Sequence, residues 1–414
     1  MNHRSSILGA AIGDISGSAH EGARHNTFRA NYQFFTQQST LTDDTVLTMA
    51  VAEWLLHRDR ISIADALRKW GSRFPNAGYG TGFKHFLKTG VAAYAPTNGA
   101  AMRVAPVGEW AKSLDEALAL AEESAAVTHG EGGVTGAQAI AAATFLAKEG
   151  IARGREVDAV KADIKTFIAE RFGYDLSLGL EEIRSRSKEM AGKKAQYKAT
   201  GIIPAGYVRS SDATLSCSMA ITAALLGTSF EESVRFAVSM GGDSDTVAAM
   251  AGSIAAQLYG IPDELVSRAL VFLPAEMISL INAFEGSDFQ PTGISPHRID
   301  RWSGEGECVV YGDAPEGQTP EDGWFETRPT LYTRHPAAAY PIPTIGRSLA
   351  EIQSGVEAFI AHAQAHPEMR FHVRKVGYHK TGYTVAQIAP LFAPALNLNL
   401  PNVLLPAEII HALQ

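Results

Sequence analysis

Two short acidic segments, each at the start of an apolar stretch, constrain this chain most strongly. The first is LTDDTVLTMA over residues 41–50, and the second is GGDSDTVAAMAG over 241–252. Both place aspartates beside a threonine at the point where the apolar periodicity of a helix begins. Carboxylates this close together near a core need a cation or a basic partner to compensate them. The fold therefore has to bring positive charge to both helix starts.

Two interpretations of these segments are open. One is helix capping, because the backbone N–H groups and the dipole at a helix start favour anions. Capping uses one side chain, however, whereas each segment offers three oxygen ligands. The six ligands are Thr42, Asp43, Asp44, Asp243, Asp245 and Thr246. Six hard oxygens suit a pair of Mg²⁺ ions, with Mn²⁺ as the alternative, and not zinc, provided that the two helix starts meet in space.

A further acidic element lies upstream in GDISGSAHE, residues 13–21. Its two carboxylates, Asp14 and Glu21, are seven residues apart, which is about two turns, so both would point the same way if the segment were helical. A glutamate without a partner beside a metal pair is a candidate acid or base. Taken alone, Glu21 is more simply a solvated surface residue.

The first 295 residues predict an all-α domain. Apolar residues recur at helical spacing in TVLTMAVAEWLL, and GAQAIAAATFLAKEG (136–150) is an alanine-rich helix for which Gly150 is a plausible end. The helix at 246–260 has a face of mostly small side chains, which allows close packing. Strand patterns are scarce in this region.

The remainder of the chain differs in composition. Residues 296–340 are rich in proline, glycine and acids, so we expect connecting loops there. Residues 341–414 predict a small α/β module, with strands at 370–377 and 401–406. Its helices begin with two capping boxes, Ser348 to Glu351 and Thr384 to Gln387.

The bulk properties exclude several classes of protein. The net charge of −8 argues against duplex nucleic acid as a sequence-independent partner, although a local patch could still serve one. Two cysteines make neither a disulfide framework nor a cysteine metal site. The chain also has no apolar run long enough to span a membrane, so we expect a cytoplasmic protein. Its oligomeric state is left open.

Five segments in this order resemble the signature blocks of the ADP-ribosylglycohydrolase family, over about residues 5–290. They are GDISGSAHE, LTDDT, NGAAMRVAPVG (98–108), THGEGGVTGAQA (128–139) and GGDSDTVAAMAG. The resemblance implies an all-α fold in which the first and last acidic blocks meet around two magnesium ions. The C-terminal module is similar to a small α/β domain of bacterial and phage proteins that has no settled activity.

The resemblance also implies roles for single residues. The six oxygen ligands named above would hold the metal ions, and Glu21 would act as acid, base or gate. The ADP-ribose would be bound by the following residues: Asn98, Gly99, Met102, His129, Gly130 and Tyr207. For His129 a capping or core role is the alternative, and for Tyr207, in the GYV segment, a core role. Arg103 could bind a diphosphate, but a structural ion pair is the simpler interpretation. The basic stretch 184–198 is most simply a solvated face, although a macromolecular substrate might contact it.

The resemblance therefore implies a Mg²⁺-dependent hydrolase that removes ADP-ribose from an acceptor, with protein arginine as the first expectation. Serine, a nucleic-acid base or a small-molecule conjugate are alternative acceptors. Three other functions stay open: an ADP-ribose sensor without catalysis, an immunity protein that acts by occluding a toxin, and hydrolysis of another ribosyl or phosphoribosyl bond.

Overall fold

The structure is a computed structural model that describes residues 2–22, 25–36, 38–289, 307–311, 338–342, 344, 346–367, 369–373, 376, 383–398, 400 and 402–413. The chain divides into two compact units. The first comprises Met1–Ser72, Gly78–Ala269 and Leu280–Ser287, and the second comprises Arg73–Ala77, Leu270–Ser279 and Asp288–Gln414. No helix in the described ranges combines the length and the apolar character that crossing a membrane requires.

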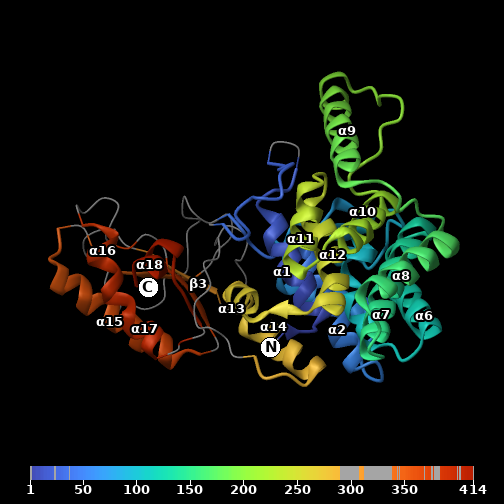
Figure 1. The fold of residues 1–414 in the computed structure, drawn as a ribbon. Helices are drawn as coiled ribbons and strands as arrows, with labels where there is room; N and C mark the ends of the chain where they lie inside the picture. Colours follow the sequence, from blue (N-terminus) through green and yellow to red (C-terminus); the bar gives the residue numbers. More distant parts are fainter. Residues whose placement is uncertain are drawn as a thin grey trace. The chain divides into compact units, whose positions relative to one another are not determined.

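The chain up to residue 287 is helical, as predicted (Figure 1). Its helices are α1 (Ser6–Ser18), α2 (Asp43–Leu56), α3 (Ile63–Arg73), α4 (Thr81–Thr89), α5 (Ala105–Trp110), α6 (Leu114–Ala126), α7 (Glu131–Ala152), α8 (Val157–Phe172), α9 (Leu180–Thr200), α10 (Ala213–Leu226), α11 (Phe230–Ser239), α12 (Ser244–Tyr259), α13 (Asp263–Leu270) and α14 (Ala275–Glu285), with a 3₁₀ turn at Asn98–Arg103. The only strands in this described part are β1 (Asn2–His3) and β2 (Ile261–Pro262), which pair antiparallel.

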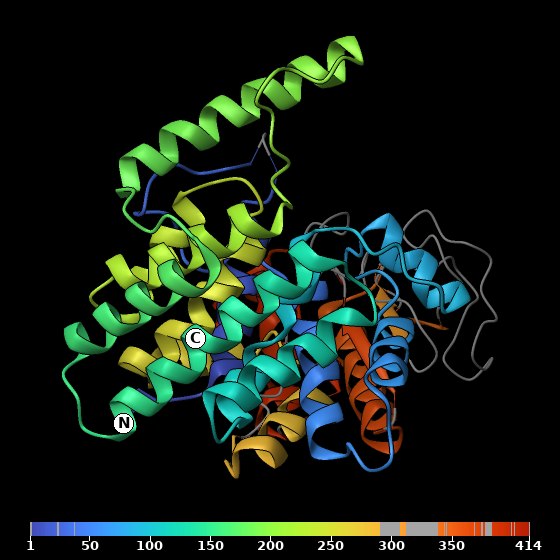
Figure 2. The same ribbon diagram turned by 90° about the vertical axis from the view of Figure 1, so that its right-hand side faces the viewer.

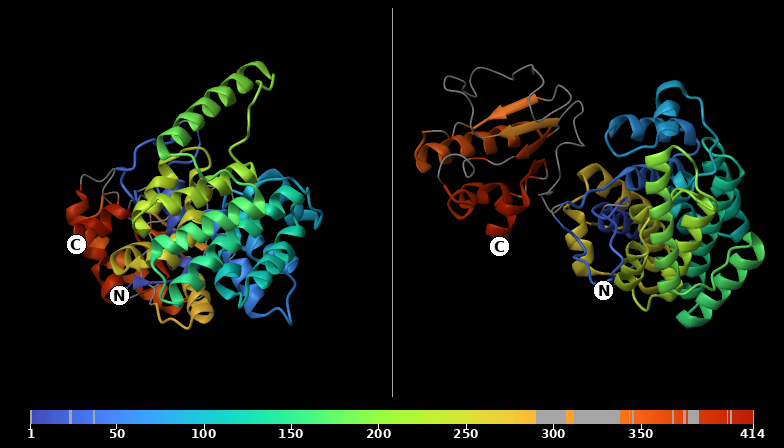
Figure 3. Two further views of the ribbon diagram at one scale, coloured as in Figure 1. Left: turned by 45° about the vertical axis from the view of Figure 1, so that its right-hand side comes forward. Right: turned by 90° about the horizontal axis from the view of Figure 1, so that it is seen from above.

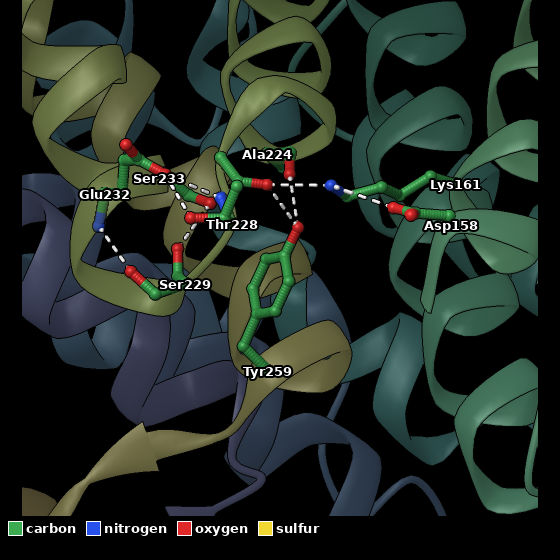
Figure 4. Close-up of polar contacts among 9 residues, drawn as sticks. Asp158, Lys161, Ala224, Thr228, Ser229, Glu232, Ser233 and Tyr259 are labelled. Atoms are coloured by element: carbon green, nitrogen blue, oxygen red, sulfur yellow. Dashed lines mark hydrogen bonds and ion pairs between the residues drawn. The ribbon is translucent and has the colours of Figure 1, made fainter. Parts of the chain in front are cut away.

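The core of the first unit is built around α12, whose residues Ser244–Leu258 are all buried. Small side chains on α12 allow neighbouring helices to approach closely, as the sequence predicts. Tyr259 at its end holds the turn between α10 and α11 (Figure 4). The Tyr259 hydroxyl donates to the Gly227 carbonyl at 2.6 Å, and Lys161 of α8 donates to the same oxygen at 2.8 Å.

The prediction that Gly150 ends its helix is wrong, because α7 continues to Ala152. A Cβ atom on Gly150 would lie 2.5 Å from Cγ2 of Val160 on α8. The glycine is therefore a contact point at which two helices pack closely.

The second unit contains a four-stranded parallel sheet in the order β4-β3-β5-β6. Its strands are β3 (Glu307–Tyr311), β4 (Ala338–Pro341), β5 (Arg370–Val373) and β6 (Val403–Leu404), and its helices are α15 (Leu349–Ala365), α16 (Val385–Ile388), α17 (Ala393–Asn397) and α18 (Ala407–Leu413), with a 3₁₀ turn at Ala389–Phe392. The apolar face of α15, with Val356 and Phe359, packs in one core with Val310 and Phe371 of the sheet. Both predicted capping boxes are present, at Ser348 and Thr384.

The structure differs from the prediction of connecting loops at 296–340. Residues 307–311 form the inner strand β3, and β4 begins at Ala338; the rest of that segment lies outside the described residues. The sheet needs β3 because it pairs with β4 on one side and with β5 on the other. Strand ECVVY is short and lies within a segment rich in turn-forming residues, so the composition of that segment predicts loops and not a strand.

Candidate metal centre

Helices α1 and α12, which are far apart in the sequence, cross at glycines and carry several of the acidic residues. Helix α1 contributes Gly9, Gly13 and Gly17, one on each turn, against α12. A Cβ atom built on Gly13 would lie 2.0 Å from the Ala248 carbonyl oxygen, and one on Gly17 would lie 2.5 Å from Cα of Asp245. The backbones touch at this crossing, which places the carboxylates of both helices side by side.

Asp14 of α1 organises the start of α2. Its Oδ2 accepts hydrogen bonds from the backbone N–H groups of Thr42 and Thr45 at 2.8 and 3.1 Å, and its Oδ1 accepts from the Thr42 hydroxyl at 2.8 Å. These N–H groups belong to the first turn of α2 and have no partner within the helix. Asp14 therefore caps α2 although it belongs to α1, and it fixes the orientation of the first turn of α2, which carries Asp43 and Asp44.

The two predicted helix starts meet directly. The Thr246 hydroxyl of α12 donates to Oδ2 of Asp44 at 3.2 Å. Oδ1 of Asp44 is buried and has no hydrogen-bond donor among the described residues. A buried carboxylate oxygen without a donor is costly unless a cation occupies the space beside it.

Asp243 stands at the N-cap position of α12, yet its side chain makes no capping hydrogen bond. Its Oδ2 instead accepts from Nδ2 of Asn98 at 2.7 Å. The chain can turn into α12 here because Gly241 and Gly242 adopt φ values of 76° and 80°, a region that favours glycine. Asn26 holds this turn through its Nδ2, which donates to the Gly242 carbonyl, and its Oδ1, which accepts from the Gly242 N–H.

The carboxylates form two groups that share one residue. Oxygen atoms of Asp14, Asp44 and Asp245 lie within 4.8 Å of one another, and so do those of Glu21, Asp243 and Asp245. The helix that carries Asp14 does not extend to Glu21, because α1 ends at Ser18. The chain bends back beyond that end, so exposed Glu21 still reaches the second group.

Burial and mutual repulsion raise the pKa values of these carboxyl groups. Burial is the largest cause in each, and it raises the pKa of Asp14 and of Asp243 to about 6. The pKa of Asp43 rises to about 8 through burial and then through the charges of Asp14, Asp243 and Glu21. The pKa values of Asp44 and Asp245 lie well above the ordinary range for the same reasons. The centre is electrostatically strained unless positive charge is supplied.

The residues present fit one or two divalent cations. The donors are hard carboxylate and hydroxyl oxygens, which suit Mg²⁺ or Mn²⁺, and Asp44 offers a buried oxygen that no protein donor satisfies. Asp43 belongs to neither close group, although its charge couples to both. Thr42 already uses its hydroxyl to cap Asp44 N–H at 3.3 Å and to bond Asp14, so the capping interpretation also holds for this residue.

A second polar cluster lies on the other side of Asn98. His129 is buried, with Nδ1 at 2.8 Å from the Thr128 hydroxyl and Nε2 at 3.2 Å from the Thr97 hydroxyl. Thr128 also accepts a hydrogen bond from Arg103 at 2.9 Å, which links the imidazole to that guanidinium. Burial, followed by the charge of Arg103, lowers the pKa of His129 to about 3. The ring is therefore neutral at physiological pH.

The simpler interpretation of Arg103, a structural ion pair, is wrong. Its side chain is fully buried and donates to the Ser124 carbonyl at 2.7 Å and to Thr128, and no carboxylate pairs with it in the described ranges. Burial lowers its pKa to about 9. Arg103 acts on the cluster through Thr128 and does not reach a surface where a diphosphate would bind.

The other predicted ADP-ribose residues surround this cluster. Gly99 packs against the ring of His129, since a Cβ there would lie 3.1 Å from Nε2. Gly130 is the N-cap of α7 and leaves that helix start without a side-chain cap, so its first N–H groups are available to an anion. Met102 is 5% exposed and belongs to the core. Its backbone carbonyl faces Thr48 of α2.

Tyr207 lies apart from these residues. It is half-buried against Tyr197 of α9, with the ring centroids 6.3 Å apart. The same tyrosine lines a pocket that is also lined by Asp243 and by residues of α9. The alternative of a plain core tyrosine does not describe it.

The residue that sequence reasoning left out of the site is Asp14. The GD pair is an acidic element in the sequence, but the role of Asp14 depends on four hydrogen bonds to Thr42 and Thr45 at the start of α2, which spacing along the chain cannot show. The signal that could have found it is the glycine at every fourth position of α1, which indicates a helix packed closely on another.

Comparisons with known proteins show what this chain is similar to. The family model for ADP-ribosylglycohydrolase matches residues 2–285. An uncharacterized protein of Archaeoglobus fulgidus is 29% identical over 291 residues, which cover 63% of this chain and 88% of that protein. ADP-ribosylhydrolase ARH3 of Homo sapiens is 26% identical over 322 residues, covering 62% of this chain and 85% of its own. A solved structure titled "ADP-ribosylglycohydrolase-related protein complex" has a TM-score of 0.47 and 26% identity, covering 68% of this chain and 95% of that one.

Proposed function

Since the chain belongs to the ADP-ribosylglycohydrolase family, we propose that it hydrolyses the glycosidic bond between ADP-ribose and an acceptor, with the help of two Mg²⁺ or Mn²⁺ ions. The acceptor that we propose is an arginine side chain of a protein, as the resemblance to bacterial glycohydrolases of this family implies. The cytoplasmic location stays a prediction from the sequence.

One observation carries the proposal. Two helix starts that are two hundred residues apart in the sequence meet at the contact between Thr246 and Asp44, which is 3.2 Å long. Beside it lies a carboxylate oxygen that has no donor among the residues that the structure describes. A fold that only needed helix caps would have no reason to gather so many buried carboxyl groups at one point. Hard cations are the compensation that this donor set favours.

The residues of the chain divide the work between binding and proton transfer. When bound, a divalent cation would supply Lewis acidity and orient the vicinal hydroxyls of a ribose. Asn98 holds Asp243 in place, and the uncapped start of α7 after Gly130 can accept the diphosphate. Glu21 is the exposed carboxylate at the edge of the centre, so it can exchange protons with water or with a leaving atom at the anomeric carbon.

The test is release of free ADP-ribose from ADP-ribosyl-arginine, ADP-ribosyl-serine and an ADP-ribosylated oligonucleotide, each with Mg²⁺ or with EDTA. We expect release from the arginine conjugate with Mg²⁺ and none with EDTA. Glu21→Gln is expected to reduce the rate about 10²- to 10⁴-fold, the usual contribution of a general acid or base. Binding of ADP-ribose, measured by calorimetry, should persist in this variant.

Glu170→Gln, a change of an exposed glutamate on α8, is the matched control and should leave the rate unchanged. Release that is insensitive to EDTA and to Glu21→Gln would contradict the proposed chemistry. Binding of ADP-ribose without release from any conjugate would indicate a sensor instead.

A further inference from the structure

Helix α9 and the chain that follows it form an arm on the first unit. We call residues 180–209 the arm; they comprise α9 (Leu180–Thr200) and the return segment 201–209. Figure 2 and the left panel of Figure 3 show the far part of α9 standing away from the other helices, with the return segment beside it. Within α9 only Ile183 and Arg184 are buried. Packing within the unit therefore accounts for little of this helix, which suggests that its exposed surface has a function.

The arm is positively charged in a negatively charged protein. It has seven basic and three acidic residues, a net charge of +4, whereas the whole chain carries −8 and the remaining residues therefore carry −12. Arg184, Arg186 and Lys193 pair with glutamates of the same helix. Lys194 lines a pocket together with Asp243, whose negative charge it partly compensates. Lys198 and Arg209 are exposed and make no ion pair within the ranges that the structure describes, so these two cations can face a partner.

The arm is also unusually apolar at its surface. Of the eight large hydrophobic side chains that are exposed among the described residues, four lie on the arm. Ile202 and Ile203, which directly follow the end of α9, are 72% and 63% exposed, and the other two are Tyr197 and Val208. Exposed apolar groups gathered beside unpaired charges are typical of a protein–protein contact surface.

A pocket connects the arm with the acidic centre. Met190 and Lys194 of α9 and Tyr207 of the return segment line it, and so do Gly242 and Asp243. Of the residues predicted to bind ADP-ribose, Tyr207 lines this pocket, and Asn98, Gly99, Met102, His129 and Gly130 do not. The arm thus reaches the centre through the pocket beside Tyr207, and its exposed residues beyond the pocket are where the acceptor protein can lie.

We infer that the arm is the docking surface for the acceptor protein, and that it selects a segment carrying acidic and apolar residues beside the ADP-ribosylated side chain. This inference rests on the proposed function and adds the partner to it. A nucleic acid fits less well, because the remaining −12 charge would repel a polyanion and two exposed isoleucines would have no role in binding phosphates. An acidic, apolar protein segment complements both properties.

The experiment compares peptides that share one ADP-ribosyl-arginine and differ in its flanks. One peptide has flanks of aspartate and leucine, and the other has flanks of lysine and serine. About ten residues in total are enough, because an extended chain of that length spans the roughly 30 Å of α9. Serine-linked versions of both peptides, and ADP-ribosyl-arginine without a peptide, complete the set of probes.

The arm variant Lys198→Glu/Ile202→Ser/Ile203→Ser changes only exposed residues outside the pocket. The matched control, Lys165→Glu/Leu226→Ser, changes an exposed lysine and an exposed leucine of α8 and α10. We expect the intact protein to prefer the acidic-apolar peptide by about tenfold in kcat/KM, which corresponds to roughly 1.4 kcal/mol, mainly through KM. The arm variant should lose this preference and hydrolyse ADP-ribosyl-arginine at the original rate, and the control should keep both.

Several results would overturn the inference. The preference could survive in the arm variant, or the variant could bind free ADP-ribose more weakly, which would make the arm part of the ADP-ribose site.

A single-stranded oligonucleotide that competes with the peptide and binds through the arm would indicate a nucleic-acid partner. A dimer that light scattering detects in the intact protein and not in the arm variant would indicate a second copy of this chain. If no probe releases free ADP-ribose, the proposed function itself is contradicted, and this outcome is thereby distinguished from a failure of the inference about the arm.

Discussion

At the scale of single residues, Asp44 shows what the centre requires. One of its oxygens accepts from Thr246, the other is buried without a donor, and the nearest charged groups are carboxylates. A carboxylate in such surroundings destabilises the folded chain unless a cation compensates it. The same residue is therefore expected to be harmful to stability without metal and essential with it.

We predict that Asp44→Asn raises stability in EDTA, by about 1–3 kcal/mol in the free energy of unfolding, because it removes a buried charge. It should also abolish the stabilisation by Mg²⁺, which for the original chain reaches about 2.7 kcal/mol at a hundred times the dissociation constant. Thermal unfolding with and without Mg²⁺ measures both effects. Asp115→Asn, at an exposed position of α6, is the control and should keep the Mg²⁺ response. Equal Mg²⁺ responses in Asp44→Asn and in the original chain would rule out this residue as a ligand.

A second prediction concerns Asp43 and pH. Its pKa is raised to about 8 in the folded chain, so between pH 6.5 and 8 the folded state holds a proton that the unfolded state has released. Stability in EDTA should therefore fall as the pH rises through this range, by at most about 1.4 kcal/mol per pH unit for one proton. His129 contributes little above about pH 7.5, because there it is neutral in both states. Urea unfolding should give a shallower pH dependence for Asp43→Asn, and an identical slope would contradict the assignment.

At the scale of elements, the crossing of α1 and α12 sets the geometry of the centre. Gly9, Gly13 and Gly17 let the two backbones touch, and Asp14 and Asp245 project from that contact. Asp14 then fixes the start of α2 through Thr42 and Thr45. The close contact between α1 and α12 thus positions α1, α2 and α12 around the candidate metal centre.

We predict that Gly13→Ala destabilises the protein by about 3 kcal/mol and weakens its response to Mg²⁺. The new Cβ would lie 2.0 Å from the backbone oxygen of Ala248, so the helices must separate and carry Asp14 away from Asp245. Gly192→Ala, in α9, is the matched control because nothing lies within 4 Å of its Cβ position. This control should gain about 0.5–1 kcal/mol from higher helix propensity. Chemical unfolding and a Mg²⁺ titration measure both variants, and equal behaviour would show that the crossing tolerates a methyl group.

At the scale of the whole molecule, the chain consists of a helical unit with the candidate centre and a second unit built on a parallel sheet. The predicted boundary of the second unit at residue 341 cuts this sheet, because β3 lies at Glu307–Tyr311. Cys308 and Val310 of β3 belong to the same apolar core as α15.

We predict that truncation after residue 340 yields less soluble protein than truncation after residue 289. The first truncation leaves β3 without β5 and exposes its buried side chains, whereas the second removes the whole sheet. Yield and light scattering of the two truncated chains measure the difference. Equal solubility would mean that β3 does not depend on the later strands.

The sequence predicted the helical class of the first unit, the two acidic helix starts and both capping boxes, because each of these depends on neighbours a few residues away. Apolar periodicity fixes a helix, and a threonine followed by acids fixes its start. It failed for Gly150 and for β3, where the deciding partner is another element, α8 in one case and the adjacent strands in the other.

By itself the sequence determined which side chains are available to the centre, namely the aspartates, threonines and Glu21 in a fixed order. Only the tertiary structure decided that they meet, that Asp14 belongs with them as the cap of α2, and that Arg103 is buried without a counter-ion. The physical reason is range. Capping and helix propensity act over one turn of the chain. Desolvation and repulsion between carboxylates depend instead on distances in space. Here those distances are set by the glycines of α1, which contact α12 more than two hundred residues later in the sequence.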